Sequence, residues 1–282
     1  MIKDITIDNI DFLFDLIPPE LIDSLGREYY HGIYSCENDK EDEPTGALIW
    51  SLENMSDPDK MRSEIVFFEA YDTDTCEELM LQYNSFIRGE GIKNTYSELS
   101  EVRDDMREVL EAAGFTLTMQ ESSKVRMSLR EIMRRKSGDR KIPDYIVPIT
   151  EVPLTEFRKC IGECVKKKNT GSIEDIVLLP PVWFEPRLSC AVYKDGTVTG
   201  MYLVHKTTSA LIEPQLLYVT GPDSKMEIVH MLNYTIQNAM DIYPSDCEIQ
   251  FSRRDERTAV LVSYVLPDYK GKMIIAGIRN EI

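Results

Sequence analysis

The sequence is short of the features that mark membrane, secreted and nucleic-acid-binding proteins. No apolar run approaches the roughly 18 residues that a membrane-spanning helix needs, and the N-terminus lacks the basic region and apolar core of a secretion signal. Lysine and arginine number 32 against 49 aspartates and glutamates, a net charge of −17. No basic stripe with interleaved aromatic residues offsets this charge. We therefore expect a soluble, cytoplasmic protein without membrane or nucleic-acid partners.

Histidine and cysteine are also sparse, with three and six residues in the 282-residue chain. His31, His205 and His230 lie far apart in the sequence, and we interpret His205 and His230 as structural because neither fits a known catalytic triad. Cys160 and Cys164 are four residues apart and would share one face of a helix. A zinc site needs a second pair of ligands that the sequence does not offer. We expect reduced, packed thiols and no metal site.

The negative charge is concentrated in the first half of the chain. Residues 1–140 hold 31 acidic and 16 basic side chains, whereas residues 141–282 hold 18 and 16. A field of this sign repels an anionic cofactor, so cofactor binding is disfavoured in the first half far more than in the second.

The length and the 43% content of hydrophobic residues are enough for two packed cores. A basic, polar stretch without apolar periodicity, residues 133–143, contains Gly138 and Pro143 and is typical of a linker. It predicts an N-terminal domain of residues 1–132 and a C-terminal domain of residues 144–282.

Both halves predict the same kinds of element in nearly the same order, which indicates an internal duplication. In the first half we expect a helical stretch over 9–25 broken at the two prolines, strands at 32–36, 46–52 and 64–71, a helix from Thr75, a strand at 94–98, a helix at 104–113 and closing strands within 116–129. In the second we expect a strand at 145–149, a helix at 155–168, a proline-interrupted loop at 179–183, strands at 188–193 and 198–205 joined by an Asp-Gly turn, a strand at 210–219, a helix from Ser224, a strand at 247–252, a helix at 257–265 and a closing strand at 272–278.

Four short segments resemble conserved parts of the GNAT superfamily of acyl-CoA-dependent N-acyltransferases. Ser63–Ala70 and Leu211–Val219 resemble the family's fourth strand, and Leu110–Phe115 and Tyr264–Tyr269 resemble the end of its late helix. The resemblance implies an α/β protein of the α+β type. It would consist of two GNAT-like domains, each with a mixed, mostly antiparallel central sheet flanked by helices.

The resemblance also implies a chemistry: transfer of an acetyl group from acetyl-CoA to an amine. In the second half Glu213 lies on the fourth strand, where the family's bases are found, and Tyr264 stands at the position of the general acid. The alternatives are a strand-edge carboxylate facing water for Glu213 and a packed aromatic side chain for Tyr264. In the first half Leu110 stands at the tyrosine position and has no proton to donate.

The family's glycine-rich phosphate loop is missing from both halves. In the second half Glu227 and Val229 stand where two glycines are typical, and a looser phosphate cradle would be formed by Val219, Gly221, Ser224, Lys225 and Met226. The alternative is an ordinary helix start in which Ser224 and Glu227 form a capping box. The first half has four acids at the corresponding place, Asp72, Asp74, Glu77 and Glu78, so we expect no cofactor there.

Two functions of different classes remain open at this stage. The first is an N-acetyltransferase acting on a cationic amine, such as a polyamine, an aminoglycoside or a lysine side chain. The second is a non-catalytic descendant of the fold that acts as a small-molecule sensor or a protein-interaction module. Glu213 and Tyr264 favour the enzyme, and the lost glycines favour the sensor.

Trp183 and Phe184 would either line the acceptor pocket or pack in the core. The sequence does not indicate an oligomeric state.

Overall fold

In the computed structural model the chain forms two compact units. Unit 1 comprises residues 1–122 and 270–282, and unit 2 comprises residues 123–269. The structure describes residues 1–280 apart from 28, 38–39, 56–58, 136–140, 168–173, 178, 208–210, 221–223, 254–261 and 264–268. Within this part of the chain, no helix combines the length and the apolar character that crossing a bilayer requires.

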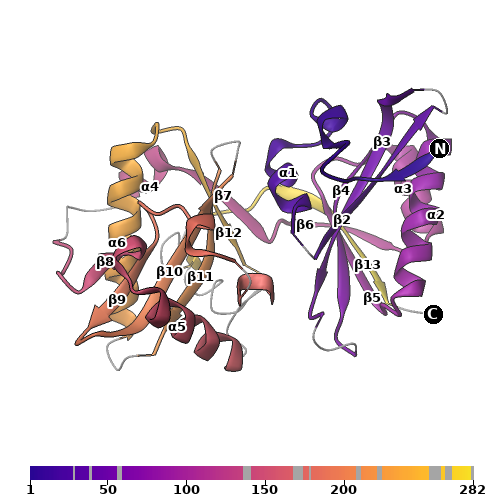
Figure 1. Ribbon diagram of the computed structural model, residues 1–282. Coiled ribbons are helices and arrows are strands. Elements are labelled where there is room, and N and C mark those ends of the chain that lie inside the picture. The colour runs from indigo at the N-terminus through magenta and orange to yellow at the C-terminus, as the bar shows by residue number, and fades with distance from the viewer. Residues whose placement is uncertain are drawn as a thin grey trace. The chain divides into compact units, whose positions relative to one another are not determined.

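Unit 1 is built on a seven-stranded mixed sheet with the order β1-β2-β3-β4-β5-β13-β6 (Figure 1). Its strands are β1 (Ile2–Asp4), β2 (Tyr30–Glu37), β3 (Lys40–Glu53), β4 (Arg62–Ala70), β5 (Asn94–Leu99), β6 (Thr116–Glu121) and β13 (Met273–Asn280). Its helices are η1 (Ile10–Leu13), α1 (Pro19–Leu25), α2 (Thr73–Gly89) and α3 (Asp104–Ala112). The two short helices η1 and α1 confirm the expected break at Pro18 and Pro19, because proline ends a helix at the preceding turn.

Helices α2 and α3 cover one face of this sheet, and η1 and α1 pack on the other. The helix α2 buries Cys76, Leu79 and Tyr83 against the sheet, which explains its amphipathic spacing. It begins two residues before the predicted start at Thr75. Its cap is Asp72, whose carboxylate accepts a hydrogen bond from the Thr75 backbone N–H at 2.7 Å.

Unit 2 is built on a six-stranded mixed sheet with the order β7-β12-β11-β10-β9-β8. Its strands are β7 (Lys124–Ser128), β8 (Ile146–Pro148), β9 (Cys190–Lys194), β10 (Thr197–Lys206), β11 (Ile212–Val219) and β12 (Glu248–Ser252). Its helices are α4 (Leu129–Arg135), η2 (Ile149–Glu151), α5 (Leu154–Lys166), η3 (Glu174–Val177), η4 (Pro181–Trp183) and α6 (Ser224–Ile242). The expected Asp-Gly hairpin is confirmed: Asp195 and Gly196 both have positive φ, as the tight turn between β9 and β10 requires.

Two apolar clusters cover the two faces of the unit 2 sheet. The α6 face buries Tyr202, Ile212 and Ile249, and the α5 face buries Leu203 and Leu216. Cys160 and Cys164 on α5 belong to the second cluster, and all six cysteines, which lie among the described residues, are buried thiols outside any disulfide. The expected two packed thiols on one helix face are therefore confirmed.

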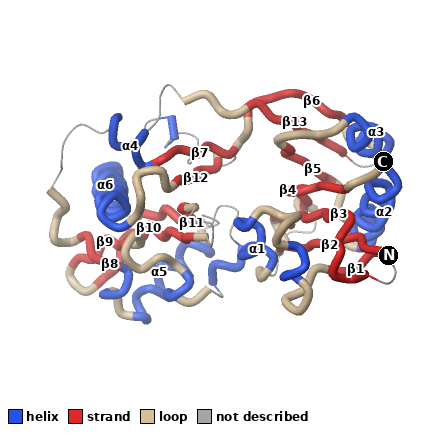
Figure 2. Tube along the Cα trace, turned by 90° about the horizontal axis from the view of Figure 1, so that it is seen from above, coloured by secondary structure: helices blue, strands red, loops and turns tan. Residues whose placement is uncertain are grey.

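The two sheets exchange their closing strands, which corrects the predicted domain boundaries. The expected closing strand of the second half is β13, but it lies in the unit 1 sheet, between β5 and β6. The last of the strands expected within 116–129 is β7, but it pairs with β12 in unit 2. The chain therefore passes from unit 1 to unit 2 between Ser122 and Ser123 rather than in a linker at 133–143, and α4 occupies the first residues of that stretch. Both chain ends consequently lie in unit 1 (Figure 2).

One side chain anchors β13 in its place. The guanidinium of Arg279 is half-buried and donates hydrogen bonds to Thr95 Oγ1 at 3.0 Å, to Asn84 Oδ1 at 2.5 Å and to the Ala113 carbonyl at 3.0 Å. It also lies 4.9 Å from the ring centroid of Phe115. Burial lowers the pKa of Arg279, because removal from water disfavours the charged guanidinium. Arg279 thereby ties the last strand to α2, β5 and the end of α3.

A short turn should allow unit 1 to fold alone. Met273 on β13 pairs with Glu121 on β6 in antiparallel register, so a two-residue Asn-Gly turn can join residues 1–121 to residues 273–282. We expect this fusion to unfold cooperatively when followed by circular dichroism. Residues 1–122 alone should not, because β5 and β6 would lack the strand that lies between them. Cooperative unfolding of residues 1–122 alone would contradict the assignment.

Substitution of Arg279 should destabilise unit 1. Arg279→Met removes the hydrogen bonds to Thr95, Asn84 and Ala113, and we expect the free energy of unfolding to fall by roughly 2 kcal/mol. The matched control is Lys93→Met, which removes an exposed cationic side chain next to the start of β5. Urea denaturation of the two variants measures the difference, and equal stabilities would show that Arg279 does not anchor the strand.

Candidate functional site

The strand β11 separates from β12 soon after the two begin to pair. They pair in parallel at Ile212 and Ile249, and β11 then continues to Val219 along β10. A β-bulge places Gln215 as an extra residue in β11, opposite Leu203 and Val204. Pro214 precedes it, and a bulge is one of the few sheet positions that tolerate proline, which has no N–H for the ladder. The far part of β11 is thus left with an edge that β12 does not pair with.

Glu213 lies where the two strands begin to separate, in a row of polar side chains that crosses the sheet. Its Oε1 atom accepts a hydrogen bond from Gln250 Nε2 on β12 at 2.6 Å. Gln250 Oε1 in turn accepts a hydrogen bond from Arg126 Nε on β7 at 2.7 Å. On the other side, His205 on β10 stands directly opposite Glu213 in the antiparallel register. Residues so paired have side chains on the same face, with Cβ atoms about 5 Å apart.

His205 is held by the loop that precedes the central hairpin of unit 2. Its Nδ1 atom lies 2.9 Å from the Trp183 carbonyl oxygen, and its ring stacks on the Trp183 indole with centroids 3.8 Å apart. A carbonyl only accepts hydrogen bonds, so Nδ1 carries the proton and Nε2 is the basic nitrogen of the neutral ring. Of the predicted aromatic pair, Phe184 is buried in the core, whereas Trp183 is half-buried against this histidine.

The predicted phosphate cradle lies at the far end of β11. Val219 ends the strand, and Ser224, Lys225 and Met226 form the first turn of α6, with the Lys225 and Met226 side chains exposed. Val219 lies six positions after Glu213, which corresponds to about 20 Å of extended strand at 3.3 Å per residue. The predicted base and the predicted cradle therefore lie at opposite ends of one strand, and only a long, extended ligand reaches both.

Glu227 does not form the predicted capping box with Ser224. Its side chain is 3% exposed and accepts a hydrogen bond from Lys194 Nζ on β9 at 2.7 Å. The Lys194 ammonium also lies 4.2 Å from the ring centroid of Tyr145. This carboxylate points into unit 2 and is neutralised there, so it does not place a negative charge at the exposed start of α6.

Two predicted site residues cannot be placed. Gly221 and Tyr264 both lie outside the described residues, as does most of the helix expected over 257–265. The structure therefore brings Glu213 together with Gln250 and His205, and it gathers Val219, Ser224, Lys225 and Met226 around the start of α6.

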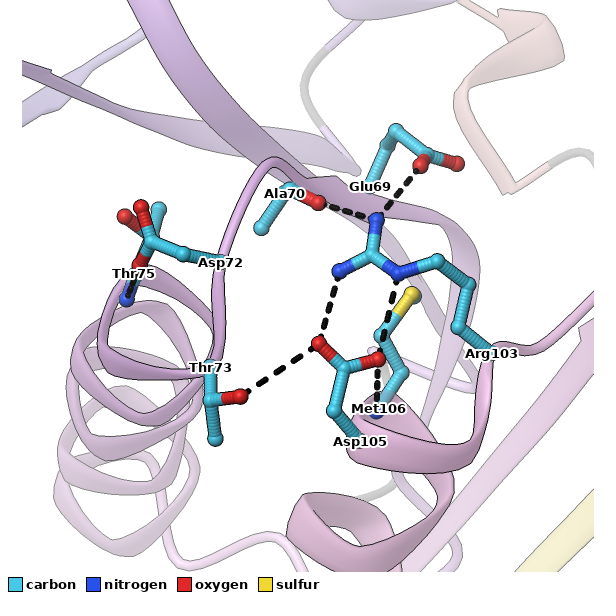
Figure 3. A network of polar contacts seen from close by, with 8 residues as sticks. All are labelled: Glu69, Ala70, Asp72, Thr73, Thr75, Arg103, Asp105 and Met106. Atoms are coloured by element: carbon cyan, nitrogen blue, oxygen red, sulfur yellow. Dashed lines mark hydrogen bonds and ion pairs between the residues drawn. The ribbon is translucent and has the colours of Figure 1, made fainter.

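The corresponding place in unit 1 is filled by an arginine. The strand β4 pairs in parallel with β5 as far as Ile65 and Ser97 and then continues to Ala70. Beyond that point Arg103 donates a hydrogen bond to the Ala70 carbonyl and pairs with Glu69 and with Asp105 (Figure 3).

The start of α2, which follows β4, is closed as well. The Arg103 guanidinium makes two hydrogen bonds to Asp105, at 2.9 and 3.1 Å, and Thr73 donates a hydrogen bond to the same carboxylate at 3.4 Å. The Asp72 carboxylate accepts a hydrogen bond from the Thr75 backbone N–H at the start of α2. This hydrogen bond lowers the pKa of the Asp72 carboxyl group. Carboxylates thus take the place that an anionic ligand would need in unit 1.

The chain is similar to known proteins in structure but not in sequence. No family model and no curated protein matches the chain. A tandem GNAT protein from the clavulanic acid biosynthesis pathway superposes with a TM-score of 0.56 and 11% identity, over 96% of this chain and 87% of that one. A proposed acetyltransferase from Pyrococcus horikoshii superposes with a TM-score of 0.54 and 13% identity, over 100% and 89% of the two chains.

The chain has a divergent GNAT fold. A conserved protein of unknown function from Bacteroides thetaiotaomicron is also similar, with a TM-score of 0.52 and 12% identity over 99% of both chains. At these identities the likeness establishes the fold alone. It confirms the predicted fold class of two mixed sheets flanked by helices.

The strand exchange sharpens the charge contrast between the two GNAT-like units. Counted by the observed boundaries, unit 1 holds 30 acidic and 12 basic side chains, a net charge of −18. Unit 2 holds 19 acidic and 20 basic side chains, a net charge of +1. The unit that contains Glu213 and Lys225 is therefore close to neutral, and the unit closed by Arg103 carries the negative charge of the whole chain.

The sequence does not single out two residues of the polar row in unit 2, Gln250 and Arg126. The contacts of His205 with Trp183 agree with the structural role expected for this histidine. A neutral amide and a surface arginine carry no motif of their own, and only the sheet register brings them to Glu213. The one available signal was alternation, which puts Gln250 on the face opposite the apolar Ile249 and Phe251.

Removing the partner of Glu227 should destabilise unit 2. Lys194→Met leaves a buried carboxylate without its counter-charge, and we expect the free energy of unfolding to fall by roughly 2 kcal/mol. The double variant Lys194→Met with Glu227→Met should recover much of this loss, because no buried charge remains. Urea denaturation of the single and double variants measures the coupling, and additive effects would refute the pairing.

Proposed function

We propose that unit 2 transfers an acyl group from acetyl-CoA, or a related acyl-CoA, to an amine. The observation that carries the proposal is the position of Glu213, a carboxylate held by Gln250 where β11 leaves β12. The GNAT fold is the scaffold of acetyltransferases among the similar structures. The proposal places the protein in the cytoplasm, with a small-molecule or peptide amine as its second substrate.

The length of β11 supports a coenzyme of this shape. The nucleotide end of an acyl-CoA is anionic, its thioester lies at the opposite end, and an extended arm with two amide groups joins them. The first turn of α6 offers backbone N–H groups and the exposed Lys225 to the anionic end. The edge of β11 beyond Ile212 offers main-chain groups to the amides of the arm, as in strand addition. The thioester would then lie near Glu213.

The reaction assigned to this site balances without a further reactant. The amine nitrogen, once deprotonated, attacks the thioester carbonyl carbon. The C–N bond forms, the C–S bond breaks, and the thiolate leaves. An ammonium loses two protons on the way to the amide: we assign the removal of the first, before attack, to Glu213 or to a water molecule that it holds, and the second leaves the nitrogen for solvent as the C–S bond breaks. We assign to Tyr264 the protonation of the thiolate, on the strength of the resemblance of its segment.

The charge distribution assigns different roles to the two units. Unit 2, with a net charge of +1, does not repel a polyanionic coenzyme, whereas unit 1, with −18, does. The Arg103 network occupies in unit 1 the place that the coenzyme would take. The same negative field attracts cations, which favours a cationic amine such as a polyamine, an aminoglycoside or a lysine side chain as acceptor.

Acetyl-CoA should bind to unit 2 and not to unit 1. At a concentration 100 times its Kd it should stabilise the protein by about 2.7 kcal/mol in a thermal-shift experiment. Lys225→Glu places a negative charge at the α6 start and should weaken binding about tenfold, a loss of about 1.4 kcal/mol. The matched control is Lys166→Glu, the same charge change at an exposed position of the last turn of α5. It should bind as the unaltered protein does.

Two results would refute this proposal in different ways. Absence of any shift at millimolar acetyl-CoA would exclude the coenzyme. Binding that Lys225→Glu does not weaken would place the coenzyme elsewhere than at the α6 start. If acetyl-CoA binds but no amine from a panel of polyamines, aminoglycosides and lysine peptides releases free CoA thiol, the missing glycines would favour a sensor instead. Isothermal calorimetry and a thiol-release assay distinguish these cases.

A further inference from the structure

Glu213 is held by a chain of two hydrogen bonds that begins at the outer strand of the unit 2 sheet. Arg126 on β7 donates from Nε to Gln250 Oε1 at 2.7 Å, and Gln250 donates from Nε2 to Glu213 Oε1 at 2.6 Å. The strand register places the first pair directly opposite each other, because Gln250 pairs with Arg126. Three adjacent strands, β7, β12 and β11, thus supply one side chain each.

The direction of these hydrogen bonds is fixed by chemistry. A guanidinium has donors only, so the group of Gln250 that faces Arg126 must be its carbonyl oxygen. The amide nitrogen of Gln250 then necessarily faces Glu213, and a donor in this position favours the ionised form of the carboxyl group. The hydrogen bond from Gln250 thereby fixes the position of Oε1 of Glu213 between β11 and β12.

We propose that Gln250, oriented by Arg126, is a positioning residue that holds the Glu213 carboxylate ionised and fixes its place at the point where β11 leaves β12. The proposal rests on the proposed acyl transfer for its catalytic consequence, but the relay itself can be measured without any substrate. Without Arg126, the Gln250 amide could turn and present its oxygen to Glu213, which would repel the carboxylate. Arg126 therefore acts on Glu213 through Gln250 and not by direct contact.

Other ionisable groups face Glu213 and are not part of the relay. His205 lies opposite it on β10, with Nε2 as its basic nitrogen. By the alternation of side chains along the strands, Glu248 on β12 and Lys124 on β7 share the face of Gln250 and Arg126. They flank the relay at positions two residues away from it. Glu248 is negatively charged and Lys124 positively charged, so their effects on the charge of Glu213 oppose each other. The directed hydrogen bond to Glu213 comes from Gln250.

The relay is tested by following the titration of Glu213 itself. Nuclear magnetic resonance of protein labelled with carbon-13 at the glutamate carboxyl carbons resolves this group, and Glu213→Gln identifies its signal by deleting it. In Gln250→Leu, which removes the donor, the Glu213 midpoint should move up by about one pH unit, since a hydrogen bond to a charged group is lost. Arg126→Leu, a change at an exposed position, should move it in the same direction.

Two further variants separate positioning from a general effect of charge or folding. Arg126→Lys keeps a side chain that only donates and should restore most of the original midpoint. Arg130→Leu removes an exposed arginine of α4 that bonds to Ser245 rather than to the relay, and it should leave the midpoint unchanged. In turnover measurements the acid limb of the kcat/KM profile should move with the Glu213 midpoint, with the affinity for acetyl-CoA preserved.

The outcomes distinguish the relay from the proposed function. A midpoint that does not move in Gln250→Leu overturns the relay, whatever the turnover. An equal effect of Arg130→Leu and Arg126→Leu does so too, because it would show a long-range charge effect. A moved midpoint with an unmoved acid limb overturns the positioning role, since Glu213 would then not be the base. A moved midpoint in a protein that does not bind acetyl-CoA upholds the relay and overturns the proposed acyl transfer.

Discussion

The hydrogen bonds on the two edges of β13 hold the sheet of unit 1 together. Six residues of β13 pair with β5 and six with β6, so these strands meet only through it. A side chain at Gly277 would displace the Ser97 hydroxyl and would be in tight contact with Phe115. Arg279 adds hydrogen bonds to α2 and to the end of α3. A strand from the end of the chain therefore completes the unit that begins it, and each unit depends on residues that a simple duplication would assign to the other.

Most of the local structure could be predicted from the sequence because its signals are local. Apolar spacing, Pro18-Pro19 and the Asp195-Gly196 turn act within a few residues, and the elements that they predict are present. The strand exchange could not be predicted, since an apolar strand such as β13 fits the edge of either sheet and its partner is set by distant pairing. The prediction of a capping box between Ser224 and Glu227 is wrong for a related reason. The Glu227 carboxylate accepts a hydrogen bond from Lys194, which lies 33 residues before it in the sequence.

The candidate site shows the same division between local and distant information. Glu213 could be singled out because its strand resembles one in a known family, and that strand does carry it into a polar row. Gln250 and Arg126 could not, because their importance arises from the register of three strands rather than from their own sequence neighbourhood. The sequence predicts that the first half of the chain is more negative than the second, and unit 1 is indeed more negative than unit 2. The charge contrast became larger once the boundaries followed the strand pairing, because basic residues of β7, α4 and the following segment belong to unit 2.

The exchange of strands also has a consequence for biosynthesis. Ribosomes release a chain from its N-terminus, and domains generally fold as they emerge. Unit 2 is one continuous segment, residues 123–269, and can close before translation ends. Unit 1 emerges first but waits for residues 270–280 to fill the gap between β5 and β6. The unit that is made first is thus the last to be completed, and during that delay its strong negative charge helps to keep the incomplete sheet from aggregating.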